Sequence, residues 1–426
     1  MKRIAIASLG CRVNRADGVA LGAAFDPARV ELCDAAADAD LYVVNSCTVT
    51  HAASAQSLKL ARQIARRHPD RPIVFTGCHA QLDREAAAGL AGVVRVVDNP
   101  GKAELPRLIA ELLQRPDLCD GRSRPLADLA RQRRPALKVQ DGCDSRCSYC
   151  IVPFVRGSSR STPLNQVVAQ VAALADAGVA EVVLSGVHLG DYRARDEVTG
   201  AAIDLAGLVE QILARTAIPR LRLSSVDPLE ITPRLGDLLA GEPRLCRHLH
   251  LPLQSACDRI LAAMNRGYRL ADVRERIDEL RRRCPALCIG LDVIVGFPGE
   301  DAVAFEQTRA GLSGVGFAYL HVFPFSARPG TAAADMSDRP PEREVRRRCR
   351  ILRELSEEKR RAFERAQIGS RLQLVAERNG PAGTAVRGTT DNYLDLMVAT
   401  GRPPGTLVDV VVEAIGRPGL ATEVRG

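Results

Sequence analysis

The stretch LKVQDGCDSRCSYC (137–150) places three cysteines in a short loop directly after an apolar run. These are Cys143, Cys147 and Cys150, separated by three residues and then by two. A compact loop of this kind can fold three thiolates around one face of an iron–sulfur cube and leave the fourth iron open. Zinc favours a fourth protein ligand, and the sequence nearby offers no further Cys or His. The spacing therefore predicts an iron–sulfur site.

The pattern around this loop predicts a parallel barrel. Between about residue 136 and residue 365, strand-like apolar runs alternate with helical stretches such as 164–177 and 271–283. Six such units favour an α/β fold with a partial TIM-type (β/α)6 barrel. The three-cysteine loop then follows the first strand, at the barrel end where such enzymes carry their sites. The expected strands are LKVQ (137–140), EVVLSG (181–186), RLRLSS (220–225), HLHLPLQ (248–254), LCIGLDVIVG (287–296) and AYLHVFPF (318–325).

Polar residues and glycines mark the ends of the other predicted barrel strands. They occur in LSGVHLGD (184–191), SSVDPLE (224–230), LPLQSACD (251–258) and VIVGFPGED (294–302). A glycine at a strand end lets a ligand approach the backbone closely. We therefore expect these ends and the three-cysteine loop to outline one cofactor cavity. The residues expected to bind the cofactor there are Gly186, Ser225, Gln254 and Ile294.

A second cysteine set is predicted in an N-terminal domain over residues 1–130. Strand-like runs alternate there with helical stretches at 52–67 and 102–114, which predicts a parallel α/β sheet. The runs are RIAIASL (3–9), LYVVN (41–45), IVFTG (73–77) and VVRVVD (93–98). Cys11, Cys47 and Cys78 each come just after one of the first three runs. Because the carboxyl ends of parallel strands share one sheet edge, we expect these three thiolates to converge on a second iron–sulfur cluster with an open iron.

The remaining cysteines and the histidines show no comparable placement. His248 and His250 share one face of a predicted barrel strand, and the favoured interpretation of each is a hydrogen-bonded structural histidine. The other seven cysteines are interpreted mainly as small packing residues. They are Cys33, Cys119, Cys246, Cys257, Cys284, Cys288 and Cys349.

The last region, residues 367–426, changes character. Five short strands separated by Gly and Pro predict a small β-barrel: LQLVAE (372–377), GTAVRGTT (383–390), YLDLMVA (393–399), LVDVVVEAI (407–415) and LATEVR (420–425). The middle domain is expected over 136–365 and ends in an Arg- and Glu-rich helix at about 341–366. Two basic runs, RQRRP (131–135) and REVRRRCR (343–350), are candidate contacts for a nucleic-acid backbone, with Arg346, Arg347 and Arg348 as the residues to test.

The composition fits a globular protein of two or three domains. Of the 426 residues, 46% are hydrophobic and 26% are charged, which excludes a disordered or fibrous chain. The net charge of +8 permits an anionic partner without requiring one. The sequence contains no run of 18 apolar residues, so it predicts no membrane helix. We therefore expect no membrane partner and a cytoplasmic location. Thirteen cysteines are too few for a disulfide scaffold of this length and favour metal binding in a reducing compartment.

Several motifs resemble the methylthiotransferases, which are radical S-adenosylmethionine (SAM) enzymes with two [4Fe–4S] clusters. The resemblance covers essentially the whole chain. It implies that Cys143, Cys147 and Cys150 hold the cluster that binds SAM, and that Tyr149 packs near the adenine of SAM. It also implies that Cys11, Cys47 and Cys78 hold an auxiliary cluster, and that the terminal barrel is an RNA-binding TRAM domain. The motifs are LGCRVN (9–14), VVNSCTVT (43–50), FTGCHAQ (75–81), KVQDGCDSRCSYCIVPFVRG (138–157), HLPLQSACDRILAAMNRGY (250–268) and VIVGFPGED (294–302).

Within the family, LGCRVN is most similar to the branch that acts on N6-threonylcarbamoyladenosine in tRNA. The isopentenyladenosine branch tends to carry GCQMN there, and the ribosomal-protein branch LGCPKN. Two departures concern the choice of substrate rather than the chemistry. Ala256 stands where the family usually has Gly in LPLQSG, and Asn14-Arg15 replaces the usual Asn-Gln of the branch.

The resemblance also implies a mechanism and partners. One SAM methylates a sulfur at the auxiliary cluster, and a second SAM is cleaved reductively to a 5′-deoxyadenosyl radical. The radical abstracts hydrogen from carbon 2 of the modified adenine at position 37, in the anticodon stem-loop of tRNA, and the methylthio group couples there. A flavodoxin- or ferredoxin-type reductant and a sulfur donor are required. The alternatives are the same chemistry on isopentenyladenosine or on a ribosomal-protein aspartate, and a non-catalytic iron–sulfur RNA-binding sensor.

Overall fold

The computed structural model describes residues 1–119, 129–130, 132–197, 199–380 and 385–424. Contacts divide the chain into two compact units. The first comprises residues 1–131, 141–160 and 326–334, and the second comprises residues 132–140, 161–325 and 335–426. Among the described residues, no helix is long and apolar enough to cross a membrane.

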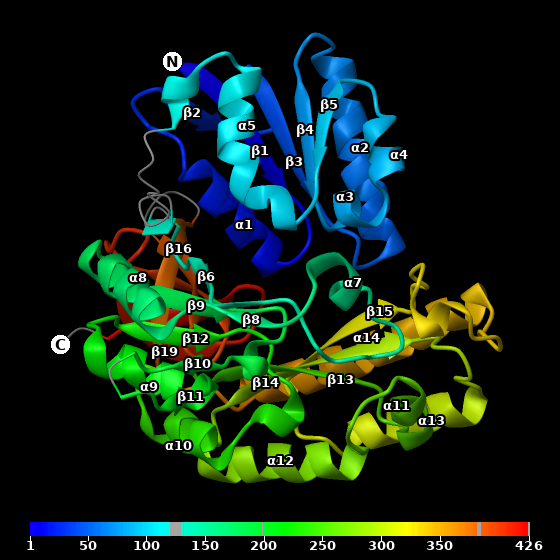
Figure 1. Ribbon diagram of the computed structural model, residues 1–426. Helices are drawn as coiled ribbons and strands as arrows, with labels where there is room; N and C mark the ends of the chain where they lie inside the picture. Colours follow the sequence, from blue (N-terminus) through cyan, green and yellow to red (C-terminus); the bar gives the residue numbers. More distant parts are fainter. Residues whose placement is uncertain (120–128, 131, 198, 381–384, 425–426) are drawn as a thin grey trace. The chain divides into compact units, whose positions relative to one another are not determined.

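The first unit is built on a parallel five-stranded sheet with the order β2-β1-β3-β4-β5 (Figure 1). Its strands are β1 (Lys2–Ser8), β2 (Val30–Cys33), β3 (Leu41–Ser46), β4 (Ile73–Gly77) and β5 (Val93–Val97). Its helices are α1 (Arg12–Gly22), α2 (His51–Arg67), α3 (Cys78–Leu82), α4 (Arg84–Ala88), η1 (Pro100–Glu104), α5 (Leu105–Leu112) and η2 (Pro116–Leu118). The parallel α/β sheet expected for the N-terminal region is thus present.

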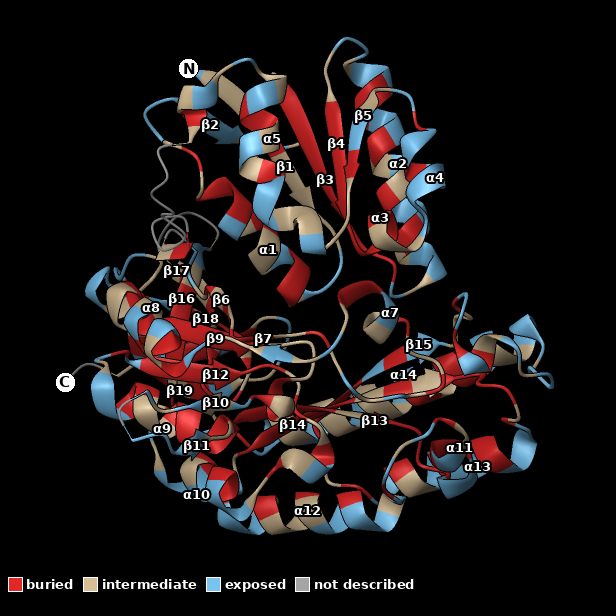
Figure 2. Ribbon diagram, in the orientation of Figure 1, coloured by how far each residue is buried: buried red, intermediate tan, exposed pale blue. Residues whose placement is uncertain are grey.

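Two apolar cores form on the two faces of this sheet. Residues of α2, α3 and α4 pack on one face, and residues of α1 and α5 pack on the other. The central strands β3 and β4 are therefore buried along their whole length, as Figure 2 shows. Strand β2 was not predicted, because it has only four residues and two of them are exposed, which gives it no apolar run.

Two further segments complete the first unit. Residues 141–160 carry the three-cysteine loop and the short helix α7 (Val152–Arg156), and residues 326–334 contain the 3-10 turn η5 (Ala332–Ala334). The chain crosses between the units near β7 (Gln140–Asp141) and β8 (Arg160–Ser161).

The second unit contains the six parallel strands that the sequence predicts. They are β6 (Ala136–Lys138), β9 (Glu181–Ser185), β12 (Arg220–Leu223), β13 (His248–Gln254), β14 (Cys288–Val295) and β15 (Tyr319–Pro324). Hydrogen bonds join these strands into two parallel sheets, with the orders β12-β9-β6 and β13-β14-β15. Two isolated bridges, Leu221 with Leu245 and Ser225 with His250, connect the chain at β12 to the chain at β13. This is a partial (β/α)6 barrel, and the prediction is confirmed.

Seven helices accompany these strands: α8 (Leu164–Asp176), α9 (Leu205–Arg215), α10 (Pro233–Gly241), α11 (Asp258–Ala263), α12 (Leu270–Arg283), α13 (Ala302–Ser313) and α14 (Glu342–Arg365). Short elements lie in the loops: η3 (Leu189–Asp191), β10 (Ala194–Arg195), β11 (Ala202–Ile203) and η4 (Pro228–Glu230).

The terminal strands close into a separate five-stranded barrel with the order β16-β17-β18-β20-β19. They are β16 (Arg371–Asn379), β17 (Ala385–Thr390), β18 (Asp395–Ala399), β19 (Leu407–Ala414) and β20 (Gly419–Glu423). Alternate apolar residues fill its interior. The predicted small β-barrel is confirmed, and it is consistent with a TRAM domain.

A buried charge cluster fixes this terminal barrel to the partial barrel within the second unit. Glu181 is fully buried and pairs with Arg220 and Arg222 of the neighbouring strand β12. The same two arginines donate to backbone carbonyl oxygens of Gln373 and Thr390 in the terminal barrel, at 2.7 and 2.8 Å. Removing one partner of such a cluster leaves an uncompensated buried charge, so these residues hold the two barrels together.

Candidate metal centre

Cys11, Cys47 and Cys78 lie at the carboxyl ends of the neighbouring strands β1, β3 and β4. Cys11 is the residue before α1, Cys47 directly follows β3, and Cys78 is the first residue of α3. Cys47 and Cys78 are buried, whereas Cys11 is exposed. The structure thus brings to one sheet edge the three thiols whose convergence the sequence predicts.

The electrostatics of Cys47 show that the three thiols influence one another. Burial raises the pKa of the Cys47 thiol, and Cys78 and Cys11 raise it further. Backbone N–H groups of Val49 and Thr48 hydrogen bond to this sulfur and act in the opposite direction. Such bonds stabilise the thiolate, which is the form that binds metal.

Two glycines allow the loops around Cys47 to approach closely. The φ angle is +83° at Gly10 and +95° at Gly77. A Cβ atom at Gly10 would overlap the Sγ of Cys47, and one at Gly77 would overlap the carbonyl oxygen of Ser46. Both positions need a residue without a side chain, because the backbone is left-handed and the space is taken.

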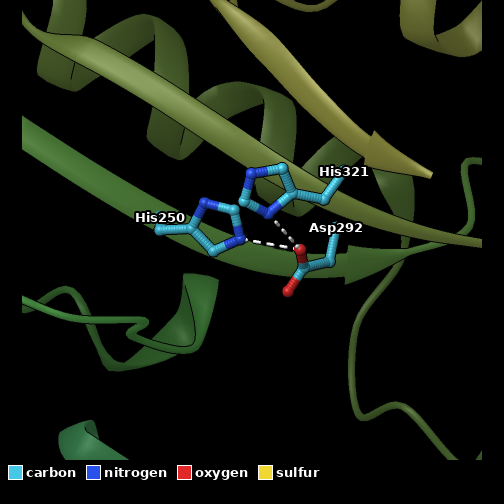
Figure 3. Close-up of side chains that lie close together, drawn as sticks. All are labelled: His250, Asp292 and His321. Atoms are coloured by element: carbon cyan, nitrogen blue, oxygen red, sulfur yellow. Dashed lines mark hydrogen bonds and ion pairs between the residues drawn. The ribbon is translucent and has the colours of Figure 1, made fainter. Parts of the chain in front are cut away.

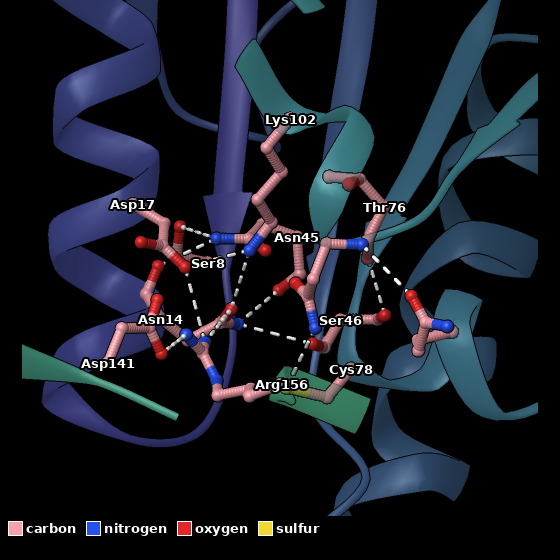
Figure 4. A network of polar contacts seen from close by, with 12 residues as sticks. Ser8, Asn14, Asp17, Asn45, Ser46, Thr76, Cys78, Lys102, Asp141 and Arg156 are labelled. Atoms are coloured by element: carbon pink, nitrogen blue, oxygen red, sulfur yellow. Dashed lines mark hydrogen bonds and ion pairs between the residues drawn. The ribbon is translucent and has the colours of Figure 1, made fainter. Parts of the chain in front are cut away.

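A buried asparagine joins two of the cysteine loops (Figure 4). The side-chain amide of Asn14 donates to the carbonyl oxygens of Leu9 at 2.8 Å, Asn45 at 3.0 Å and Ser46 at 3.2 Å. In return, the amide of Asn45 donates to the carbonyl oxygen of Asn14 at 2.7 Å. These bonds connect the chain after β1 to the end of β3. Nothing in the sequence pattern predicted this role of Asn14, which lies within the motif LGCRVN.

The hydroxyl of Ser46 connects the third loop. It donates to the carbonyl oxygen of Thr76 and accepts the backbone N–H groups of His79 at 3.2 Å and Ala80 at 3.3 Å. The end of β3 is thereby tied to the end of β4 and to the first turn of α3, which begins with Cys78. The three cysteine positions are therefore held by one hydrogen-bond network.

Two cations, the buried Arg156 and the partly buried Lys102, belong to the same network (Figure 4). Arg156 donates to Asp17 at 3.2 Å and to Asp141 at 2.9 Å, and Lys102 donates to Asp17 at 2.8 Å. Burial lowers the pKa of Arg156, but Cys78, Asp17 and Asp141 outweigh it and hold this pKa above its ordinary value. Burial lowers the pKa of Lys102, against the effect of Asp17. Positive charge beside cysteines favours their thiolate form.

The three-cysteine loop is closed by tight backbone geometry. Gly142 has a φ of +74°, and a Cβ atom there would overlap the carbonyl oxygen of Ser158. The N–H of Cys143 donates to the carbonyl oxygen of Gly157, the residue after α7, at 3.0 Å. The N–H of Cys150 donates to the carbonyl oxygen of Cys147 at 3.1 Å. These three cysteines are partly buried, and Tyr149 beside them is partly buried as well.

Both cysteine sets belong to the first compact unit, whereas the sequence analysis assigned them to two domains. Ile151 and Val155, at the start and within α7, pack against Cys78. Asn99 donates to the Sγ of Cys78 at 3.7 Å and to the carbonyl oxygen of Val155 at 2.6 Å. The helix that follows one set therefore contacts a cysteine of the other set.

Residues 326–334 form a strap that the sequence analysis missed. The hydroxyl of Ser326 accepts the backbone N–H of His51 at 3.0 Å, next to the Cys47 loop. At the other end of the strap, the N–H of Ala333 donates to the carbonyl oxygen of Ser148 at 2.7 Å, inside the three-cysteine loop. The strap thus contacts both cysteine loops. Its sequence, SARPGTAAA, has no metal-ligand pattern, and only the arginine before the Pro-Gly pair could have drawn attention to it.

The residues expected to bind a cofactor lie at the ends of barrel strands in the second unit. Gly186 and Ser225 closely follow β9 and β12, Gln254 ends β13, and Ile294 lies next to the end of β14. A Cβ atom at Gly186 would lie 2.8 Å from the side-chain oxygen of Gln140, so packing of the protein itself requires this glycine. Gln254 has a φ of +71°, a strained conformation that concentrates at functional sites. The joint cavity with the three-cysteine loop stays a prediction.

A polar chain runs across the last three barrel strands (Figure 3). The Nε2 of His250 bonds to Asp292 at 2.7 Å, and the Nδ1 of His321 lies 3.3 Å from the same carboxylate oxygen. The hydroxyl of Tyr319 joins His250 to His248. Burial raises the pKa of Asp292, but hydrogen bonds from both histidines outweigh it and keep the pKa low. These contacts agree with the interpretation of His248 and His250 as structural histidines.

His250, Asp292 and His321 each bring one possible metal-ligand atom to the same place, and these atoms lie within 4.8 Å of one another. Among the described residues, no other three His, Cys, Asp or Glu side chains form such a group. This compact group belongs to the polar chain described above and includes no cysteine of either set.

The two arginine runs are largely committed to the protein itself. Arg134 forms ion pairs with two glutamates at 2.7 and 3.0 Å. Arg348 is buried and forms ion pairs with Glu300 at 2.8 Å and Glu344 at 2.9 Å. Because Arg348 is buried in these pairs, the expectation that it contacts RNA is wrong; for the other arginines of the two runs the contact stays a prediction. Arg346 and Arg347 remain exposed, and Arg131 lies outside the described residues.

Two family models match the chain. The model of the radical SAM superfamily matches residues 137–310, which include the three-cysteine loop. The model of the uncharacterized protein family UPF0004 matches residues 3–98, which include Cys11, Cys47 and Cys78.

Curated relatives match nearly the whole chain. A protein of Aquifex aeolicus named threonylcarbamoyladenosine tRNA methylthiotransferase MtaB is 35% identical over 96% of this chain and 100% of its own length. A protein of Bacillus subtilis with the same name is 31% identical over 98% of this chain and 95% of its own length. A protein of Bordetella petrii named tRNA-2-methylthio-N(6)-dimethylallyladenosine synthase is 33% identical over 96% of this chain and 89% of its own length.

A solved structure shares the fold. The radical SAM methyltransferase TsrM of Kitasatospora setae superposes with a TM-score of 0.57 over 78% of this chain and 77% of that chain. The sequence identity is 16%, so this likeness concerns the architecture alone.

Proposed function

Since this chain belongs to the tRNA methylthiotransferases, a family of radical SAM enzymes, we propose that it adds a methylthio group to carbon 2 of N6-threonylcarbamoyladenosine at position 37 of tRNA. One observation carries the proposal: two sets of three cysteines gather in one compact unit, in a chain that matches a relative named for this activity over its full length. The substrate is the anticodon stem-loop, and a flavodoxin- or ferredoxin-type protein supplies electrons.

The residues fit two iron–sulfur clusters. Cys143, Cys147 and Cys150 hold the cluster that binds SAM, and Cys11, Cys47 and Cys78 hold the auxiliary cluster. When bound, the clusters and SAM supply a 5′-deoxyadenosyl radical and the methylthio group. Buried N–H donors and cations around the second set support the fit, because they stabilise the negative charge of thiolate ligands.

The protein's own contribution is to position and shield these groups. The Asn14 and Ser46 network fixes the three loops of the auxiliary set relative to one another. In this proposal the strand ends that carry Gly186, Ser225 and Gln254 bind SAM, which is supported by their position at the carboxyl ends of barrel strands. The terminal barrel, anchored through the cluster around Glu181, provides a fixed surface for tRNA.

A second candidate substrate is dimethylallyladenosine, also called isopentenyladenosine, in tRNA. It is supported by the relative of Bordetella petrii, whose 33% identity is close to the values of the first branch. We favour threonylcarbamoyladenosine because two relatives named for it cover the chain at 35% and 31% identity and because LGCRVN resembles that branch.

The test is mass spectrometry of tRNA nucleosides from a strain that lacks this gene and carries no redundant enzyme. We expect the 2-methylthio form of threonylcarbamoyladenosine to disappear and to return with the wild-type gene. Loss of the dimethylallyladenosine derivative instead would assign the chain to the second branch. In parallel, anaerobic incubation of the purified protein with SAM and dithionite should release 5′-deoxyadenosine. A protein that binds iron and tRNA but releases none would be a sensor.

A further inference from the structure

Arg328 differs from every other buried arginine that the structure describes. Five arginines are buried in these residues: Arg156, Arg220, Arg222, Arg328 and Arg348. The other four form ion pairs with carboxylates of Asp or Glu. For Arg328, no carboxylate of the described chain lies within ion-pair distance, although only 3% of the residue is exposed. A buried charge without a counter-ion is costly, so an anion is expected beside it.

The guanidinium is held next to Cys47 through one nitrogen only. Its Nη2 donates to the hydroxyls of Thr48 at 2.6 Å and Ser54 at 3.1 Å. Thr48 directly follows Cys47 in sequence. The Nε and Nη1 atoms are buried and have no hydrogen-bond partner in the described structure. Two donor nitrogens therefore remain available beside the auxiliary cysteines.

A second unpartnered group lies near Arg328. His79 directly follows Cys78 and is only 6% exposed, and neither of its ring nitrogens has a hydrogen-bond partner in the described residues. Asp83 and Arg328 are the charged groups close enough to act on this imidazole. An imidazole offers at least one N–H donor in either protonation state. Arg328 and His79 thus present donors near the same cysteine set.

The surrounding charges explain which ligand suits these donors. Lys102 and Arg156 are already balanced by Asp17 and Asp141. A [4Fe–4S]²⁺ core held by three thiolates is anionic, and a further sulfur anion on its open iron adds negative charge. Arg328 bonds to Thr48, the residue after Cys47, which places its charge beside this cysteine. Arg328 is the cation left to balance an incoming anion.

We propose that Arg328 and His79 form a binding site for a sulfur anion, hydrosulfide or methanethiolate, at the open iron beside Cys47. The Nε and Nη1 of Arg328 and one ring N–H of His79 donate hydrogen bonds to that sulfur. The site holds the sulfur in place, so Arg328 and His79 are positioning residues. This inference rests on the proposed function, because it requires the auxiliary cluster.

The test uses the full-length chain with Cys143, Cys147 and Cys150 replaced by Ala, so that only the auxiliary cluster assembles. The reconstituted protein is titrated anaerobically with sodium methanethiolate and, in a second arm, with sodium sulfide. Binding is followed by the electron paramagnetic resonance spectrum of the reduced cluster. The arm with the lower apparent Kd identifies the preferred anion.

Arg328→Lys is the decisive variant, because Lys keeps the charge but lacks the Nε and Nη1 atoms of the planar guanidinium. We expect its apparent Kd to rise about tenfold or more in the preferred arm, as for loss of hydrogen bonds to a charged group. His79→Phe keeps the ring packed against Phe75 and should raise Kd about threefold. Ser54→Ala, which removes one partner of Nη2 only, is the matched control and should stay near the parent value.

The outcomes separate the inference from the proposed function. No iron in the parent triple variant would refute the auxiliary cluster and with it both proposals. A normal cluster with unchanged Kd in both Arg328→Lys and His79→Phe would overturn the sulfur site and leave the proposed function intact. An equal rise in Kd for Ser54→Ala and Arg328→Lys would also overturn it, since Arg328 would then act only through its Nη2 anchor.

Discussion

The two cysteine sets reach the same compact unit by opposite routes. Cys143, Cys147 and Cys150 lie within one loop and are shaped by local backbone geometry. Cys11, Cys47 and Cys78 come from three strands and are assembled by the topology of the sheet. The local set depends on its own loop, whereas the assembled set depends on bonds between distant segments. The comparison implies that the two sets can be damaged independently.

The largest expected effect comes from deleting one ligand of each set. Cys47→Ala should abolish methylthiolation but leave SAM cleavage, because the three-cysteine loop keeps its ligands. Cys150→Ala should abolish both activities. Each variant should retain about half of the iron, corresponding to one [4Fe–4S] cluster. Iron content, 5′-deoxyadenosine release and nucleoside mass spectrometry measure the three quantities on the same preparations.

A Cys349→Ala variant provides the control, because Cys349 is a buried cysteine in α14 outside both sets. It should keep both activities and its full iron content. If Cys47→Ala and Cys150→Ala lost SAM cleavage to the same extent, the division of labour between the two sets would be refuted.

The next effect concerns the glycines that shape each set. Gly10→Ala places a Cβ atom onto the Sγ of Cys47, and Gly142→Ala places one onto the carbonyl oxygen of Ser158. Each also forces a side chain into a left-handed conformation, which costs about 1–2 kcal/mol. We expect Gly10→Ala to lose iron from the assembled set only, and Gly142→Ala to lose iron from the local set only. Mössbauer spectroscopy of the reconstituted variants measures the clusters that remain.

Gly178→Ala separates strain from overlap, because Gly178 has a φ of +79° and no atom within 4 Å of an added Cβ. It should lower the melting temperature slightly and keep both clusters. Loss of both clusters in Gly10→Ala would mean that the two sets are not independent.

The same contrast explains how much of the molecule could be predicted from sequence. The local set was found from its spacing, and the assembled set from the rule that parallel strand ends share an edge. The partial barrel and the terminal barrel followed from apolar patterns that tertiary packing did not override. The short edge strand β2 was missed, because half of its residues are exposed and it has no apolar pattern.

The supporting residues of the site could not be predicted, for a physical reason. Asn14 acts through carbonyl oxygens of Asn45 and Ser46 on another strand, and Arg328 lies 280 positions from Thr48, with which it bonds. Such roles depend on long-range geometry, and the residue types carry no spacing signal. The prediction for Arg348 failed for the same reason: an arginine run looks alike whether its members face solvent or pair with buried Glu300.

The smallest expected effect sharpens the comparison within the assembled set itself. Burial and the neighbouring thiols raise the pKa of Cys47, so in the iron-free protein its thiolate forms only as the pH rises above the ordinary thiol range of about 8.5. Exposed Cys11 is accessible to solvent. At neutral pH, iodoacetamide should therefore alkylate Cys47 about tenfold more slowly than Cys11, and the difference should shrink as the pH increases. Peptide mass spectrometry over a pH series measures both rates, and urea-unfolded protein serves as the control in which the rates converge.

Equal rates in the folded protein at neutral pH would mean that Cys47 is not buried before iron binds. Because a cysteine must lose its proton to bind metal, the expected result also predicts that iron uptake by the assembled set is favoured at alkaline pH.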